Sequence, residues 1–285
     1  MKQSDATSLR DELSQFIEGW RHDLSEAWRS VLSDVEPAAR DVREELTFST
    51  NEPIFPARRG RPYAAARPDA HIFRSFDKLD PEDVRCVLLG QDPYPCLARA
   101  TGRSFEQGEA SDWNSLRISP SLSGLVQMLA EHRTGDPRYR GKGGLRRALK
   151  ADEVGIEPPQ ELFDRWENQG VLCLNAGLTL TRYARGGTKE QVQGHIAFWR
   201  PVVASVLRFL ARRAEGQVVF LLLGKHAWQA ADRTGIRPEA LAAGTWDRSV
   251  GEVRPYHPSY RGSKRNGLIE ANNRFAAMGV KGIDW

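Results

Sequence analysis

The eleven residues VRCVLLGQDPY, at positions 84–94, decide the fold. Residues 84–89 are almost continuously apolar, a pattern typical of a strand in a parallel sheet that is covered on both faces. Gly90 ends this run, and the polar residues Gln91 and Asp92 follow it directly. The stretch therefore predicts a buried strand that carries an amide and a carboxylate at its carboxyl end.

Three further short apolar runs follow along the chain, at residues 171–174, 218–223 and 250–256. The first two resemble the run at 84–89 and are expected to be central strands, whereas the last is more polar and is typical of an outer strand. Apolar residues spaced by three and four, at 122–129 and 196–210, predict helices between the runs. This alternation predicts a single-domain α/β fold with a central four-stranded, mostly parallel sheet, flanked by helices on both faces.

Polar residues follow the other three runs as well. Asn175 comes after the second run, Lys225 follows the third by way of Gly224, and His257 follows the fourth. In open α/β sheets the ligand site lies outside the carboxyl ends of the strands, so these residues and Asp92 are expected to meet in one crevice. Each of them alone is explained as a helix cap or a turn residue. The four together indicate a functional site.

The N-terminal 50 residues show helical apolar spacing, from Leu9 to Val35, that is interrupted at Pro37. They predict a helical layer with an acidic outer face. Residues 51–69 are rich in Pro, Arg and Gly, which predicts an irregular segment on the surface.

Charge is unevenly distributed along the chain. The whole sequence has 41 basic and 37 acidic residues, a net charge of +4. Residues 1–50 hold six basic and eleven acidic side chains, so the other 235 residues carry a net charge of +9. Seven cations gather within residues 131–150: Arg133, Arg138, Arg140, Lys142, Arg146, Arg147 and Lys150. This cluster is explained either by solvated loops or by an anionic partner such as nucleic acid.

Several classes of protein do not fit the sequence. No apolar run is long enough to cross a bilayer, and the first residues have no apolar region of the kind found in signal peptides. Three cysteines without a CxxC pair do not predict a disulfide framework or a four-cysteine metal site. We therefore expect a cytoplasmic protein that needs no metal or other cofactor.

Several segments resemble, in order and at compatible spacing, the motifs of the family-1 uracil-DNA glycosylases. GQDPY at 90–94 is similar to the family's water-activating motif, and HPS at 257–259 to its second catalytic motif. ATGRSF at 100–105 is similar to the family's stacking segment, and SPSL at 119–122 to its DNA-contacting loop. GVLCLN at 170–175 is similar to its uracil-reading strand, and FLLLG at 220–224 to its next strand with the Gly-Ser loop. IDW at 283–285 is similar to its C-terminus. The resemblance covers roughly residues 70–285 and implies the family's fold and activity.

The resemblance implies two catalytic residues. Breaking the bond between uracil and deoxyribose leaves positive charge on the sugar and negative charge on the departing base, and the base must first be flipped out of the stack. Asp92 would orient the attacking water and, as a carboxylate, stabilise the cationic sugar. A neutral His257 would donate a hydrogen bond to uracil O2 as negative charge develops there.

Four further residues would hold the base. The carboxamide of Asn175 can accept from N3–H and donate to O4 of uracil, whereas cytosine presents the opposite pattern. Phe105 would stack on the ring, Tyr94 would exclude the methyl group of thymine, and the backbone amide of Gln91 would help to hold the pyrimidine.

The sequence departs from the family at three places. Pro95 stands where the family has a histidine, and Lys225 stands where a serine contacts phosphate. After HPS the family continues with a leucine that wedges into the duplex, but here Tyr260 and Arg261 follow at once. One of these two residues, or the basic stretch through Arg140, Arg146 or Arg147, would replace the wedge. Ser121 and Ser259 complete the residues expected to contact DNA.

These observations predict an enzyme that hydrolyses the N-glycosidic bond of uracil in DNA and leaves an abasic site. A non-catalytic module that senses uracil or abasic sites in DNA is the alternative. A small-molecule nucleotide hydrolase or transferase is disfavoured, because the sequence has no P-loop or GxGxxG phosphate cradle.

We expect one catalytic domain over residues 1–285, with an N-terminal layer at 1–50, a glycosylase core at 70–285 and a basic insertion at 131–160. The expected partner is uracil-containing DNA, with no membrane involved, and a monomer suffices for the chemistry. The family's DNA-mimicking protein inhibitor grips the wedge leucine, so it should bind this protein weakly.

Overall fold

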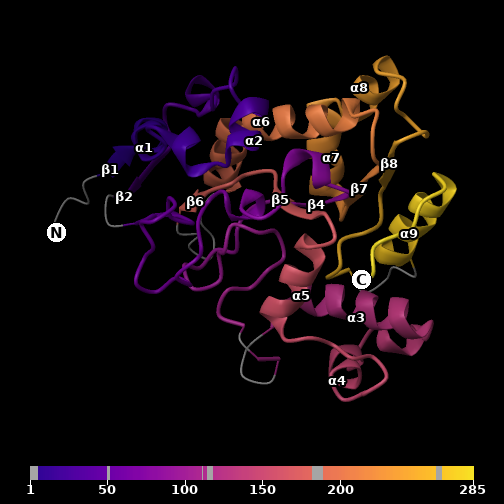
Figure 1. Cartoon of the computed structure of the whole chain (residues 1–285). Helices are drawn as coiled ribbons and strands as arrows, with labels where there is room; N and C mark the ends of the chain where they lie inside the picture. The colour runs from indigo at the N-terminus through magenta and orange to yellow at the C-terminus, as the bar shows by residue number, and fades with distance from the viewer. Residues whose placement is uncertain (1–5, 50–51, 111, 114–117, 182–188, 261–264) are drawn as a thin grey trace.

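The computed structural model describes residues 6–49, 52–110, 112–113, 118–181, 189–260 and 265–285. Its centre is a parallel sheet of four strands in the order β5-β4-β7-β8 (Figure 1). Along the chain these strands are β4 (Cys86–Gly90), β5 (Val171–Asn175), β7 (Val218–Leu222) and β8 (Val250–Val253). The predicted four-stranded parallel sheet is therefore confirmed, as is the outer position of the last strand.

One expectation about the sheet is wrong: β5 is an edge strand and not a central one. It is nevertheless fully buried, because two other segments of the chain, one at Ser75 and one at Ser104, cover its open edge. The carbonyl of Cys173 accepts hydrogen bonds from the Ser75 hydroxyl at 2.6 Å and from the Ser104 backbone amide at 2.9 Å. The continuous apolar run therefore indicates that the strand is buried, and it does not indicate that the strand is central in the sheet.

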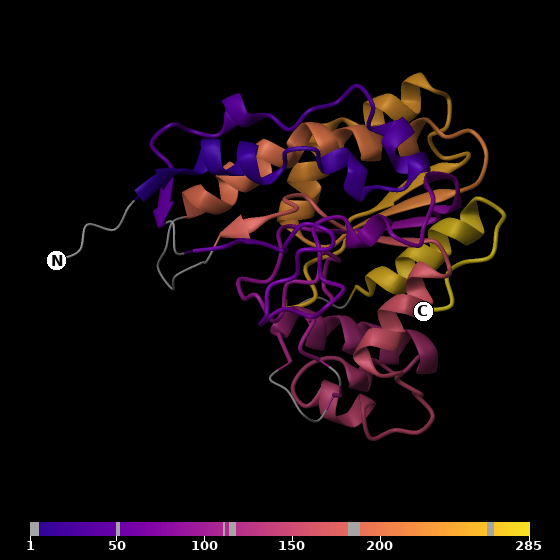
Figure 2. The same cartoon turned by 60° about the vertical axis from the view of Figure 1, so that its left-hand side comes forward.

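Successive side chains of the strands point to opposite faces of the sheet, and helices cover both faces (Figures 1 and 2). Val87 and Leu89 pack on one side and Cys86 and Leu88 on the other. The first side is covered by α6 (Lys189–Arg212), α7 (Lys225–Thr234) and α8 (Ile236–Ala242), and the second by α3 (Pro120–Thr134), α5 (Pro159–Glu167) and α9 (Gly267–Ala277).

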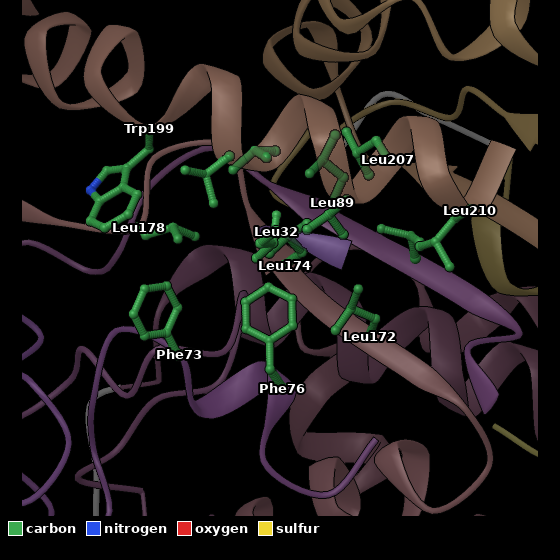
Figure 3. Packing of buried hydrophobic residues seen from close by; sticks show 14 of the residues in the cluster. Leu32, Phe73, Phe76, Leu89, Leu172, Leu174, Leu178, Trp199, Leu207 and Leu210 are labelled. Carbon is green, nitrogen blue, oxygen red and sulfur yellow. The ribbon is translucent and has the colours of Figure 1, made fainter. Parts of the chain in front are cut away.

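The larger part of the core lies between the sheet and α6. In Figure 3, Leu207 and Leu210 of α6 point toward Leu89 and Leu172 of the strands. Phe76 belongs to the same hydrophobic cluster and enters it from the side away from α6. Phe76 ends the short 3-10 helix η3 (Arg74–Phe76), which packs against β5. This dense apolar layer fixes the strands whose ends form the site described below.

The N-terminal segment belongs to the same core. It contains α1 (Leu9–Phe16) and α2 (Glu26–Val31), capped by the side chains of Ser8 and Ser25, with 3-10 turns η1 (Trp20–Asp23) and η2 (Ala39–Asp41). The helices are shorter than expected, because Gly19 adopts a left-handed conformation between them. A small antiparallel pair, β1 (Ala6–Ser8) with β2 (Thr47–Ser49), was not predicted.

The expectation that residues 51–69 lie on the surface is partly wrong. Within this segment β3 (Ile54–Phe55) pairs with β6 (Leu180–Thr181), and residues 54–58 are buried. The pairing and the apolar side chains of β3 draw this segment into the structure.

The basic segment forms its own small lobe beyond α3. It holds the 3-10 turn η5 (Pro137–Tyr139) and α4 (Gly144–Ala148), both packed on α3 and lying away from the sheet in Figure 1. The turn η4 (Pro81–Asp83), which leads into β4, completes the elements. Among the helices described, none is both long and apolar enough to span a bilayer.

Candidate active site

A cavity of about 220 Å³ opens at the carboxyl ends of β4 and β5. Because parallel strands end on the same edge, Gly90 at the end of β4 lies directly beside Asn175 at the end of β5. The cavity is lined by all six residues expected to act in catalysis and base binding, namely Gln91, Asp92, Tyr94, Phe105, Asn175 and His257, and also by Ser121. The structure therefore brings together residues from well-separated segments of the chain.

Two glycines allow these segments to approach closely. A Cβ atom at Gly90 would lie 2.4 Å from the Asn175 Oδ1 atom, and a Cβ at Gly224 would lie 2.7 Å from Cβ of His257. Gly224 also has a φ of +93°, which other residues rarely adopt. The glycines that end the runs at 84–89 and 218–223 thus make room for side chains of the site.

Asp92 is the carboxylate of the cavity. Burial raises its pKa to about 6, because a charged carboxylate loses hydration there. Its side chain has no hydrogen-bond partner among the described residues. At neutral pH the group is ionised and has a free acceptor for a water molecule.

His257 is held in a defined orientation by the turn that follows it. Its Nδ1 atom accepts the backbone N–H of Ser259 at 3.3 Å and lies 2.8 Å from the Ser259 hydroxyl. A ring nitrogen that accepts carries no proton, so the neutral ring has its proton on Nε2. Burial, and then the nearby His226, lower the pKa of His257 and favour this neutral form. The ring is a neutral hydrogen-bond donor.

Phe105 is positioned by an unusual backbone conformation. Its φ is +64°, which is rare for a bulky residue and concentrates at functional sites. The Tyr94 hydroxyl lies 3.2 Å from the Phe105 carbonyl oxygen and 2.7 Å from the Ser119 hydroxyl. The Phe105 ring lies 5.9 Å from that of His257, tilted by 34°. Tyr94 thereby links the turn after β4, the Phe105 segment and the start of α3.

Asn175 has the most informative environment. Its side chain is 3% exposed, yet its amide has no hydrogen-bond partner within the described parts of the chain. The amide is not among the fully buried, unpaired side-chain atoms of the described residues, since it lines the cavity and is open to it. A ligand with matching donors and acceptors would satisfy this amide.

A buried ionic network behind Phe105 was not predicted. Arg103 lines the cavity and pairs with Asp164 at 2.7 Å, with Glu167 and, at 3.5 Å, with Glu106, while Arg74 also pairs with Glu106. The neighbouring carboxylates raise the pKa of Arg103 despite its burial. The opposite charges on Arg103 and Glu106, either side of Phe105, were the available signal in the sequence.

Four residues expected to contact DNA surround the cavity. Ser121 lines it, Ser259 bonds to His257, and Lys225 is exposed at the first position of α7. Tyr260 is 53% exposed, and its backbone N–H donates to the His257 carbonyl at 2.8 Å. Arg261 lies outside the described residues.

The other three predicted cations lie on the basic lobe and do not line the site cavity. Arg140 pairs with Glu131 at 3.1 Å, and Arg147 donates to the Arg138 carbonyl. Arg146 is exposed and has no partner in the described parts of the chain. Arg146 is therefore the cation of this trio that is available to a ligand.

His195, another histidine of the chain, does not line the cavity. It is fully buried, its Nδ1 lies 2.8 Å from the Thr179 hydroxyl, and burial lowers its pKa to about 3. Within the described residues, no group of three or more His, Cys, Asp or Glu side chains is arranged to hold a metal ion.

Comparison with known proteins gives a consistent result. Residues 76–277 match the model of the uracil DNA glycosylase superfamily. A uracil-DNA glycosylase of Agrobacterium fabrum is 29% identical over 92% of this chain and 90% of its own length. Another from Porphyromonas gingivalis is 32% identical over 75% of each chain.

Solved structures share the fold. The crystal structure of wild-type UNG from Nitratifractor salsuginis superposes with a TM-score of 0.56 at 21% identity, over 97% of this chain and 99% of that chain. The mimivirus UNG variant Y322L, solved in complex with UGI, gives a TM-score of 0.58 at 16% identity, over 95% and 94% of the two chains.

Proposed function

The chain belongs to the uracil DNA glycosylase superfamily, and from this we propose that it excises uracil from DNA by hydrolysing the N-glycosidic bond, leaving an abasic site. The observation that carries the proposal is the cavity at the strand ends, which is lined by an ionised carboxylate, a neutral imidazole donor and an amide without a partner in the described residues. These are the three groups that the reaction needs.

Asp92 and His257 act on opposite charges of the transition state. Asp92, ionised at neutral pH, orients the attacking water and stabilises the positive charge that develops on the sugar. His257 donates from Nε2 to uracil O2, where the negative charge of the leaving base develops. Neither group has to move a proton before the bond breaks, since each already has the required form.

The base is selected by the remaining residues of the cavity. Asn175 reads N3–H and O4, and cytosine would leave its buried amide facing the wrong partners. Phe105 stacks on the ring, Tyr94 stands against C5 and excludes thymine, and the Gln91 backbone amide contributes a hydrogen bond.

DNA is held by Lys225, Ser121, Ser259 and Tyr260 around the cavity, and by Arg146 on the basic lobe. Tyr260 takes the place of the leucine wedge, because it is exposed and directly follows the His257 turn. Without that leucine, the family's protein inhibitor binds weakly. We further propose that residues 1–285 act as one monomeric catalytic unit in the cytoplasm, with DNA as the macromolecular partner.

Alkaline cleavage of a uracil-containing oligonucleotide tests the activity. The protein is incubated with the oligonucleotide, abasic sites are cleaved with alkali, and Asp92→Asn serves as the matched control, since it keeps the shape of the side chain and removes the charge. Cleavage with the wild type alone supports the proposal. Tight binding without cleavage would instead support a non-catalytic sensor of uracil.

A further inference from the structure

Three aromatic side chains form a row on the surface beside the cavity. The ring of Trp228 in α7 lies 5.9 Å from that of Tyr256, which in turn lies 5.0 Å from that of Tyr260. Tyr256 and Tyr260 are 46% and 53% exposed. Among the described residues only one other large hydrophobic side chain, Leu241 in α8, is comparably exposed. Exposed aromatic area is thus concentrated next to His257.

The row is fixed relative to the cavity. The Trp228 indole N–H donates to the carbonyl of Leu222, at the end of β7, over 2.8 Å. Tyr256 immediately precedes His257, and the backbone bond from Tyr260 to the His257 carbonyl closes the turn on its other side. The planes of neighbouring rings are inclined by 51° and 41°, so the rings are not stacked on one another.

The charges around the row favour an anionic partner. Lys225 and His226 are exposed in the first turn of α7, which holds no acidic residue, and Lys225 lies three residues before Trp228, on the same side of the helix. The nearby carboxylates of Asp232 and Glu252 are both paired with Arg254, at 2.7 and 3.0 Å. Exposed aromatic rings beside an exposed cation, here Lys225, are the combination with which proteins bind unpaired nucleotides.

We propose that Trp228, Tyr256 and Tyr260 form a stacking surface for the base next to the extruded uracil, on the same strand. The proposal rests on the glycosylase function above. When uracil enters the cavity, the neighbouring base loses the face on which it was stacked. The ring of Tyr256, one residue along the chain from His257, supplies a replacement face. The row therefore offsets part of the cost of extrusion and contacts a base that the cavity does not read.

Removing the central ring tests the surface. Binding to a single-stranded uracil oligonucleotide is measured by fluorescence anisotropy in the Asp92→Asn background, so that no substrate is consumed. Tyr256→Ala should weaken binding about tenfold, the range found for one base stacked on an aromatic ring. Tyr256→Phe, which keeps the ring, should restore the affinity. Leu241→Ala is the matched control and should bind like the parent, since it removes an equally exposed apolar side chain elsewhere.

A second arm uses the DNA to show that the contact is with the neighbouring base. Two oligonucleotides lack the base on the 5′ or the 3′ side of the uracil. With one of them the effect of Tyr256→Ala should disappear, because the base that stacked on the ring is gone. An effect that persists with both oligonucleotides, or no effect with the intact one, overturns the proposal.

Different results would contradict the glycosylase function and the stacking surface. If the wild type releases no uracil but binds in a Tyr256-dependent manner, the glycosylase function fails and the stacking surface stands. If uracil is released and Tyr256→Ala binds normally, only the stacking surface fails. Thermal unfolding of each variant verifies that the fold is retained.

Discussion

The hydroxyl of Tyr94 donates a hydrogen bond of 3.2 Å to the carbonyl of Phe105, a residue held in the left-handed region of backbone space. The bond joins the group proposed to exclude thymine to the ring proposed to stack on uracil. Burial raises the pKa of Tyr94 to about 12, so its hydroxyl keeps the proton it donates throughout the physiological range.

Tyr94→Phe should separate the exclusion of thymine by the Tyr94 ring from the positioning of Phe105 by the Tyr94 hydroxyl. The ring stays against C5, so discrimination against thymine is retained, but Phe105 loses the bond that holds its backbone. A hydrogen bond of this kind contributes about 1 kcal/mol, so KM for a uracil oligonucleotide should rise about fivefold. Tyr94→Ala is the contrasting variant and should also gain activity on thymine, measured by release of the free base. Equal thymine activity in the two variants would contradict the assignment.

The pH dependence of the reaction should report Asp92. Because its pKa is raised to about 6 and the ionised form is active, kcat/KM should rise with pH to a plateau above about 6. An acid limb near pH 4, the ordinary range for a carboxyl, would contradict the raised pKa of Asp92.

Stability should change in the opposite direction with pH. The folded chain holds the Asp92 proton more tightly than the unfolded chain, so this group favours folding below pH 4 and loses that contribution as pH rises through 6. At pH 7, Asp92→Asn should therefore unfold less readily than the wild type, by on the order of 2 kcal/mol. Denaturant unfolding at pH 4 and pH 7 measures the difference, which should shrink at the lower pH.

Asn175→Asp should abolish uracil excision, because a carboxylate cannot donate to O4. A protonated carboxyl can instead present the pattern that cytosine requires, so some cytosine release should appear. Asn175→Leu, similar in size and without hydrogen bonding, is the control and should lose both activities. Uracil activity retained in Asn175→Asp would remove this residue from base recognition.

The basic lobe should contribute to DNA affinity through Arg146 more than through Arg147. Arg146→Gln should reduce the slope of log affinity against log salt by about one unit, the value for one lost phosphate contact. Arg147 is engaged with the Arg138 carbonyl, so Arg147→Gln should act mainly on local stability. Arg29→Gln, on the exposed face of α2, changes the net charge equally and should leave the slope unaltered.

Breaking the ionic network behind Phe105 should be strongly destabilising. Arg103→Met leaves the buried carboxylate of Glu167 without its partner, while Glu106 keeps its ion pairs with Arg74 and Arg67. Removing one partner of a buried ion pair costs about 3–5 kcal/mol. The matched control is Arg138→Gln, which removes an exposed partner of Asp136 and should have little effect. Urea unfolding compares the two.

The sheet and the cavity were predictable because both depend on local signals. A buried parallel strand is a continuous apolar run, and the residue after it lies at the ligand edge, which is how Asp92, Asn175 and His257 were found together. Resemblance to a family added Tyr94 and Phe105.

The features that were missed arise from contacts between distant segments. Arg103 forms its ion pairs with Asp164 and Glu167 between segments that are far apart in the sequence. An arginine whose partners are not known from the sequence is expected to be exposed on the surface. Tyr256 was assigned to a strand that ends at Val253, so its exposure beside His257 was not anticipated. The pairing of β3 with β6 likewise depends on residues about 125 positions apart.

The N-terminal helices also limit how far this protein can be shortened. Leu9, Leu13 and Trp28 are fully buried in the same cluster as the strands, and the Trp28 indole donates to the Leu79 carbonyl at 2.7 Å. A fragment that began at residue 70 would keep every residue of the cavity and would expose an apolar face of α6 to water. For crystallography or engineering, the smallest useful fragment is therefore set by the hydrophobic core and includes these helices.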